Sequence, residues 1–165
     1  MVIGSFRAGI AALIWDPDRG AYLMLKRAAE KDFSPGAWEC VTGRLDQGEG
    51  FESALHREVR EEVGLAVQPD FIIGTTHFYR GPRDRANELV GVVYHCSPIC
   101  APVVRLSPEH QAVRWATADE AKVFLRDDHP SERWLLRVIR RAEVLRKAVP
   151  GDLITYHHES GFELG

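Results

Sequence analysis

The segment from 43 to 65, GRLDQGEGFESALHREVREEVGL, places a glycine-rich loop directly before a helix with acids on its apolar side. At about 100° per residue, the apolar residues of 51–63 fall in one sector, and Gly64 follows as a typical terminator. Glu58 and Glu62 are one turn apart and lie within this apolar sector rather than opposite it. Their spacing alone is also common on solvated surface helices. However, two carboxylates directed at the protein body repel each other and are costly to desolvate, so their position favours a bound cation.

A divalent hard cation suits such a cluster, because Mg²⁺ takes oxygen ligands and retains waters that a phosphate can replace. Glu61 lies at the edge of the same helix face and can extend the cluster. The glycines of the preceding loop allow a ligand to approach the backbone, and the loop leads to a helix N-terminus, where N–H groups favour phosphate. The two features together indicate an anion site beside a metal site, as pyrophosphate chemistry requires.

Composition is that of one globular domain of 165 residues, with a core at about 5–148 and a tail, 149–165, without a clear pattern. The formal charge of −3 argues against stable binding to nucleic acid or to an anionic membrane. The three cysteines lack a disulfide-framework pattern and favour reduced thiols in a cytoplasm. A pair such as Cys96 and Cys100 is a weak zinc signature by itself.

Alternating elements predict an α/β protein in which helices cover a mixed sheet. Strands are expected at 6–15, 22–27, 38–42, 67–80, 89–96 and 111–115, and helices at 51–63, 117–125 and 131–148. The turn at 16–20 should join the first two strands as a hairpin, and 81–88 and 101–110 read as loops. The last helix has an apolar side that predicts packing on the sheet, and a homodimer through this helix is left open.

The spacing of the 43–65 segment resembles a known family signature, the Nudix box Gly-x5-Glu-x7-Arg-Glu-U-x-Glu-Glu-x-Gly-U, where U is apolar. Every specified position is filled, by Gly43, Glu49, Arg57, Glu58, Val59, Glu61, Glu62, Gly64 and Leu65. The chain is therefore similar to Nudix hydrolases over most of residues 5–125. This resemblance implies one Nudix domain across 1–165, with a mixed sheet sandwiched between helices (α/β/α). It also implies hydrolysis of a nucleoside diphosphate linked to another moiety, with Mg²⁺ or Mn²⁺.

The resemblance also implies a metal site. Glu58 and Glu62 would be the principal ligands, Glu61 a further ligand, directly or through water, and the carbonyl of Gly43 another. A metal-activated water would attack phosphorus without a covalent enzyme intermediate.

Three residues are implied in catalysis. Arg57 would orient the carboxylates by pairing with Glu49. Glu109, six residues before Trp115, lies where an additional glutamate would complete the metal shell or act as base, although it also reads as a surface acid after a proline. Either Glu61 or Glu109 would accept the proton of the attacking water.

Substrate contacts are predicted at the strand ends. Arg27 ends the second strand, at the usual site for a phosphate-facing base in this fold, and Arg44 lies in the box. Trp38 and Tyr79 could stack on a base, with Arg80 beside Tyr79. Each has a simpler interpretation, a solvated charge for the arginines and a core aromatic for Trp38.

The predicted partner is a small nucleotide or nucleotide-like substrate, and no single one is favoured. WECVTG is similar to dihydroneopterin triphosphate pyrophosphatases, whereas LSPEHQAVRW is similar to dinucleoside polyphosphate hydrolases. The alternative function is a catalytically idle Nudix module that senses a nucleotide. Such domains generally lose box carboxylates, and this chain has all of them.

Overall fold

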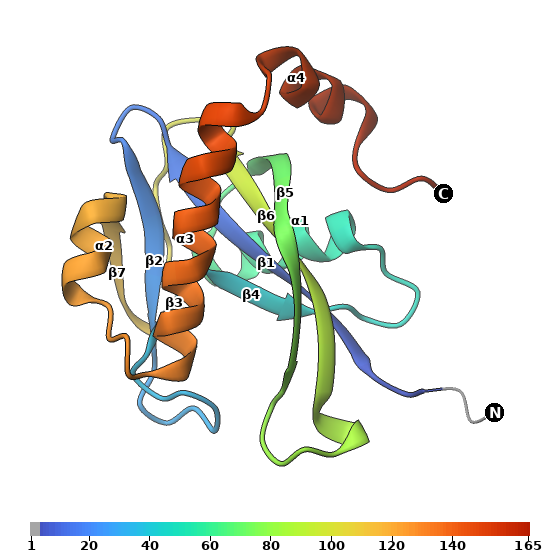
Figure 1. Cartoon of the computed structure of the whole chain (residues 1–165), viewed down its shortest axis with the longest axis vertical. Helices are drawn as coiled ribbons and strands as arrows, with labels where there is room; N and C mark the ends of the chain where they lie inside the picture. The colour runs from blue at the N-terminus through green and yellow to red at the C-terminus, as the bar shows by residue number, and fades with distance from the viewer. Residues whose placement is uncertain (1–3) are drawn as a thin grey trace.

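The computed structural model describes residues 4–165 as a curved sheet with helices on both sides (Figure 1). The strands are β1 (Arg7–Asp16), β2 (Ala21–Arg27), β3 (Trp38–Glu39), β4 (Val41–Arg44), β5 (Val67–Tyr79), β6 (Glu88–Pro98) and β7 (His110–Ala116). The helices are α1 (Phe51–Val63), α2 (Ala118–Phe124), α3 (Pro130–Ala148) and α4 (Gly151–Ser160), with a 3₁₀ turn η1 (Arg85–Asn87). The strands and the first three helices lie where the sequence predicts them, to within a few residues.

Strand β1 is the centre of the sheet. The strands are ordered β3-β2-β1-β6-β5, and β4 and β7 pair with β1 and β2, respectively. The β1–β6 pair is parallel, whereas β1 pairs with β2 and β4 in antiparallel orientation, so the predicted mixed sheet is confirmed. Both faces of β1 are covered, which explains its nearly continuous run of apolar residues.

The predicted first hairpin is short and then divides. Only Trp15 and Asp16 of β1 pair with β2, opposite Tyr22 and Ala21. Beyond this point β2 pairs with β7, while β1 pairs with β4. The single strand predicted at 38–42 is accordingly two strands, interrupted at Cys40, because β3 pairs with β2 and β4 with β1. Because of this change of partner, the Nudix box begins at the end of β4, next to β1.

Two buried clusters define the layers. Alternate β1 residues such as Ala11 and Leu13 pack with α2 and α3 on one face. Their neighbours, including Ile10 and Ala12, pack with α1 on the other. Figure 1 shows α3 in front of the strands and α1 behind them, which is the predicted α/β/α arrangement.

Local signals explain the helix ends. Helix α1 stops at Gly64, which adopts the left-handed conformation at φ 69°. Helix α2 starts with a capping box, in which Thr117 accepts from the Glu120 backbone N–H and the Glu120 side chain accepts from the Thr117 N–H. Within residues 4–165, none of the helices has the length and apolar character needed to cross a membrane.

The tail contains a helix, α4, that the sequence did not predict. The pattern is missing because none of its residues is buried, so it has no apolar stripe. Instead, α4 is held to β5 by polar contacts: His158 Nε2 lies 2.9 Å from Asp70 Oδ1, and Gln68 Nε2 donates to the His158 carbonyl at 3.1 Å. After α4, the ring of Phe162 packs edge-on against Tyr94.

Candidate active site

The end of β4 lies directly beneath the acidic face of α1. A Cβ atom on Gly43 would overlap the carboxyl group of Glu58, so this position must be glycine for α1 to pack as it does. The Gly43 carbonyl oxygen is also close to β1, 2.9 Å from where a Cβ of Gly9 would be. Two glycines therefore bring the Gly43 backbone and the Glu58 side chain together.

Arg57 ties the loop of the box to α1. Its Nε and Nη2 donate to the two oxygens of Glu49 at 2.9 and 2.8 Å, which is the predicted pair. Its Nη1 donates to Glu58 at 2.9 Å and to Glu61 at 3.2 Å, and Nη2 also donates to the Arg44 carbonyl at 2.9 Å. The bonds that Glu49 accepts from Arg57, and then the one from the Asp46 N–H, lower the pKa of Glu49 to about 2. Arg57 thereby fixes the orientation of Glu58 relative to the loop.

Glu62 points into the protein, as its place on the helical wheel predicts. The residue is 7% exposed, and burial raises its pKa to about 9, with the charges of Glu39, Glu58 and Glu109 contributing. Its Oε2 atom is buried without a hydrogen-bond partner among residues 4–165. A buried carboxyl facing three other acids is strongly disfavoured as an anion unless a cation is bound.

The other two predicted acids lie closer to solvent than Glu62. The Glu61 side chain is 60% exposed and reaches Arg57. Glu109 is 54% exposed and pairs with Lys31 at 2.8 Å, and this pairing lowers its pKa. The charge of Glu109, which lies in the loop before β7, contributes to the raised pKa of both Glu58 and Glu62. Its catalytic role stays a prediction.

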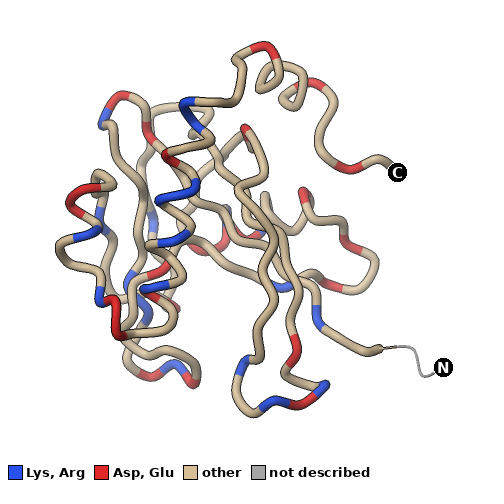
Figure 2. Tube along the Cα trace, viewed as in Figure 1, with Lys and Arg blue, Asp and Glu red and all other residues tan. Residues whose placement is uncertain are grey.

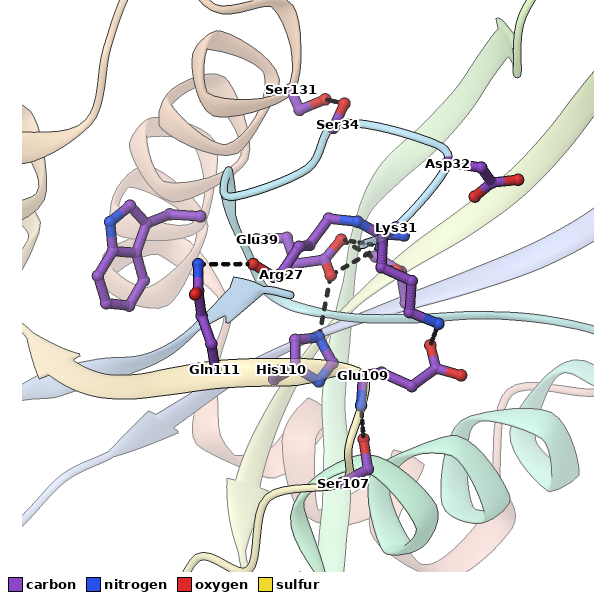
Figure 3. A network of polar contacts seen from close by, with 12 residues as sticks. Arg27, Lys31, Asp32, Ser34, Glu39, Ser107, Glu109, His110, Gln111 and Ser131 are labelled. Carbon is purple, nitrogen blue, oxygen red and sulfur yellow. Dashed lines mark hydrogen bonds and ion pairs between the residues drawn. The ribbon is translucent and has the colours of Figure 1, made fainter. Parts of the chain in front are cut away.

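The sequence did not predict the largely buried polar network around Glu39, whose charge also acts on Glu62 (Figure 3). The Glu39 carboxylate accepts from Arg27 Nη1 at 2.9 and 3.0 Å and lies 3.0 Å from His110 Nε2. An acid inside the apolar stretch WECV was the available signal for Glu39, whereas nothing local marks His110. Arg27, predicted to face substrate phosphate, has an 11% exposed side chain that is already paired with Glu39.

The remaining predicted substrate residues separate into two groups. Trp38 packs edge-on against Phe124, with ring centroids 5.4 Å apart, at the margin of the core. By contrast, Arg44 and Arg80 line one hollow of about 230 Å³ at the tip of the β5–β6 hairpin. Tyr79 lies on this hairpin, where the Arg83 guanidinium is 5.5 Å from its ring centroid.

Comparison with known proteins identifies the family. The sequence model of the NUDIX domain matches residues 5–138. The chain belongs to the NUDIX family. A MutT-like protein of Streptomyces ambofaciens is 34% identical over 101 residues, 61% of this chain and 58% of that protein. A nucleoside triphosphatase NudI of an Enterobacter strain is 45% identical over 51 residues, 31% of this chain and 36% of that protein. The chain thus spans less than two thirds of these curated relatives.

The same architecture occurs in a solved structure, that of a MutT protein from Methanosarcina mazei. It matches with a TM-score of 0.70 at 20% identity, over 91% of this chain and all of that one. At this identity the match establishes the fold alone. The NUDIX family match ends before α4, so the tail described above lies outside it.

The NUDIX helix offers oxygen atoms suited to a hard cation. Within residues 4–165, no three His, Cys, Asp or Glu side chains are already gathered in a closed metal-binding arrangement. What the site provides is the unpartnered Oε2 of Glu62, the Glu58 carboxylate and the nearby Gly43 backbone. Carboxylate and carbonyl oxygens are the ligands that Mg²⁺ and Mn²⁺ prefer, so the residues fit such an ion.

The N-terminus of α1, expected to attract phosphate, binds an acid of the chain itself. The Glu163 carboxylate accepts from the N–H groups of Phe51 at 2.9 Å and Glu52 at 3.4 Å. In return, Glu52 accepts from the N–H groups of Phe162 at 2.8 Å and Glu163 at 3.1 Å. The tail therefore caps the helix that carries the acids, and an anion does occupy this helix end.

Proposed function

We propose that this protein hydrolyses a diphosphate bond in a nucleoside di- or triphosphate-type substrate, with Mg²⁺ or Mn²⁺ as cofactor. The observation that carries the proposal is Glu62, a buried carboxyl with an unpartnered oxygen that faces other acids. Membership of the NUDIX family supports the same activity. Without a bound cation, this group of closely spaced buried acids would only destabilise the folded protein.

Glu58 and Glu62 would hold the cation, together with the Gly43 carbonyl, and Glu61 would contribute from the solvent side. When bound, the ion would neutralise charge on the diphosphate oxygens and make a water more acidic. Arg57 keeps Glu58 in place, because one guanidinium binds both Glu58 and the loop.

Glu109 is the proposed proton acceptor. Its carboxylate is close enough to Glu58 and Glu62 to raise their pKa values, and Lys31 holds it in the charged form that can take a proton. Glu61, the other candidate, also raises the pKa of Glu58, and its side chain is 60% exposed. Arg27 and His110 hold the Glu39 carboxylate, whose charge contributes to the raised pKa of Glu62.

The substrate is proposed to be a small nucleotide, in keeping with a relative named as a nucleoside triphosphatase. Arg44, Arg80 and Tyr79 are the proposed substrate contacts, and the first two line the same hollow. Free cysteines support the proposed cytoplasmic location, since none of the three forms a disulfide. Homodimerisation through α3 stays a prediction.

Turnover of a nucleotide panel with Mg²⁺ tests the proposal, with ¹⁸O-labelled water to mark the phosphorus that is attacked. Glu62→Gln should abolish turnover while the protein stays folded, and the exposed Glu159→Gln on α4 should leave it unchanged. Full activity in Glu62→Gln would refute the assignment. Nucleotide binding without turnover in the wild type would instead identify a sensor module.

A further inference from the structure

A second hollow lies where α2, α3 and the β1–β2 turn meet, and we name it the α2–α3 hollow. Its volume is about 450 Å³, within the range of roughly 300–1,000 Å³ that encloses a small organic ligand. Its floor contains Leu136 and Ile139, which belong to the buried cluster on the α2–α3 face of the sheet. Helix α1 packs on the other face, and among the described residues that line the hollow none belongs to α1. A ligand bound here is therefore separated from the acids of α1 by the sheet.

One wall of the α2–α3 hollow suits a planar ring. The central carbon of the Arg146 guanidinium lies 4.1 Å from the ring centroid of Trp15, and both side chains line the hollow. Glu143 holds the guanidinium in place, because it accepts from Arg146 Nη2 at 3.1 Å and from the Tyr22 hydroxyl at 2.7 Å. Indole and guanidinium groups both stack on aromatic faces, so this fixed pair offers a flat surface beside an apolar floor.

The rim of the α2–α3 hollow carries an excess of positive charge. Each of its two acids is already paired with a basic residue of the hollow, Asp119 at 2.7 Å and Glu143 at 3.1 Å. Two further cations, Arg140 and Lys147, are exposed and have no carboxylate partner within residues 4–165. They are two helical turns apart and so project from the same side of α3. Figure 2 shows basic residues recurring along this helix.

We propose that the α2–α3 hollow binds a small aromatic anion, with its ring on the Trp15–Arg146 wall and its anionic group held by Arg140 and Lys147. The two unpaired cations complement one carboxylate or phosphate group, and guanidinium groups match these oxyanions in geometry as well as charge. A free aromatic acid and a nucleoside monophosphate share this chemistry. The hollow contains none of the residues proposed for hydrolysis, so this binding is independent of the proposed function.

The first experiment is a fluorescence titration with the dye anilinonaphthalene sulfonate, an aromatic anion, near neutral pH in EDTA. The wild type should bind the dye at one site, and Arg140→Gln/Lys147→Gln should bind it about ten-fold more weakly or worse, because charge-assisted contacts are lost. Both side chains are exposed, so the variant should keep the wild-type fold, which circular dichroism checks. Equal affinity in the two folded proteins would overturn the inference.

Two control variants locate the bound dye. Arg133→Gln/Arg137→Gln removes the same charge from exposed positions of α3 that do not line the hollow. Glu62→Gln changes the acidic site on the other face of the sheet. Both should bind the dye as the wild type does. Weaker binding in the first control would show that net charge sets the affinity, and altered binding in Glu62→Gln would place the dye at the acidic site; either result would overturn the inference.

Competition against the dye then identifies the ligand. Adenosine monophosphate and naphthoate carry an anionic group on a planar ring system, whereas adenosine and naphthalenemethanol are their uncharged counterparts. The anions should displace the dye at concentrations about ten-fold lower than the uncharged compounds do. Displacement by adenosine monophosphate supports a nucleoside monophosphate, and displacement by naphthoate alone supports an aromatic acid. Displacement by neither anion, or equal displacement by the uncharged compounds, would overturn the proposed ligand class.

Discussion

Replacing Glu62 with glutamine should stabilise the chelator-treated protein at alkaline pH. Burial and neighbouring acids raise the pKa of Glu62 from its usual 4.5 to about 9 in the folded protein. Between these values the folded chain keeps a proton that the unfolded chain has released. Because the unfolded state then binds fewer protons, the free energy of unfolding falls as pH rises through this window. Glutamine is neutral throughout and removes this dependence.

The magnitude follows from the pKa shift. Each pH unit is worth about 1.4 kcal/mol, so from pH 4.5 to pH 8 the wild-type protein loses at most about 5 kcal/mol through this group. Glu62→Gln should recover up to that amount at pH 8, which corresponds to roughly 10–20 °C in the unfolding midpoint of a domain of this size. Near pH 5 the two proteins should differ little.

The assay is urea unfolding followed by circular dichroism, from pH 5 to pH 9 in EDTA. Glu61→Gln is the matched control, because the Glu61 side chain on the same helix is 60% exposed and should not change the pH dependence. Addition of Mg²⁺ at pH 8 should stabilise the wild type more than Glu62→Gln, since the cation replaces the missing counter-charge. Parallel pH profiles for wild type and Glu62→Gln would refute the reasoning.

Three further predictions address other parts of the structure. Gly43→Ala should weaken Mn²⁺ binding by about ten-fold or more in a titration followed by electron paramagnetic resonance, because the new Cβ displaces the Glu58 carboxyl; unchanged affinity would contradict the packing described. Glu163→Ala should cost about 1 kcal/mol and lower the thermal midpoint by about 2–4 °C, as loss of a helix cap does, whereas Glu159→Ala should not. In the folded protein, a thiol reagent at pH 8 should modify the exposed Cys100 and spare the two buried cysteines, whose pKa values burial raises; rapid modification of all three would show that the core is open.

The sequence by itself determined where the acidic helix lies and which of its faces packs against the protein. The period of apolar residues, the glutamates within the apolar sector and the terminating glycine all lie within 43–65, so short-range geometry specifies them. The inward direction of Glu62 follows from the same segment, whereas the pair between Arg57 and Glu49 is implied by its resemblance to the Nudix box, and the structure contains both. Most strands were also predictable, because each has its own run of apolar residues between turns.

The tertiary structure alone decided which distant residues surround that helix. Glu39 and His110 are 71 positions apart, and Glu163 caps a helix 112 positions earlier, so no local pattern could join them. The division of the first hairpin, which brings β4 to α1, depends on strand pairing that sequence periodicity does not encode. Helix α4 buries none of its residues and so has no apolar stripe to reveal it. A charged side chain finds its partner through the fold of the whole chain, whereas an apolar face is already determined by the spacing of neighbouring residues.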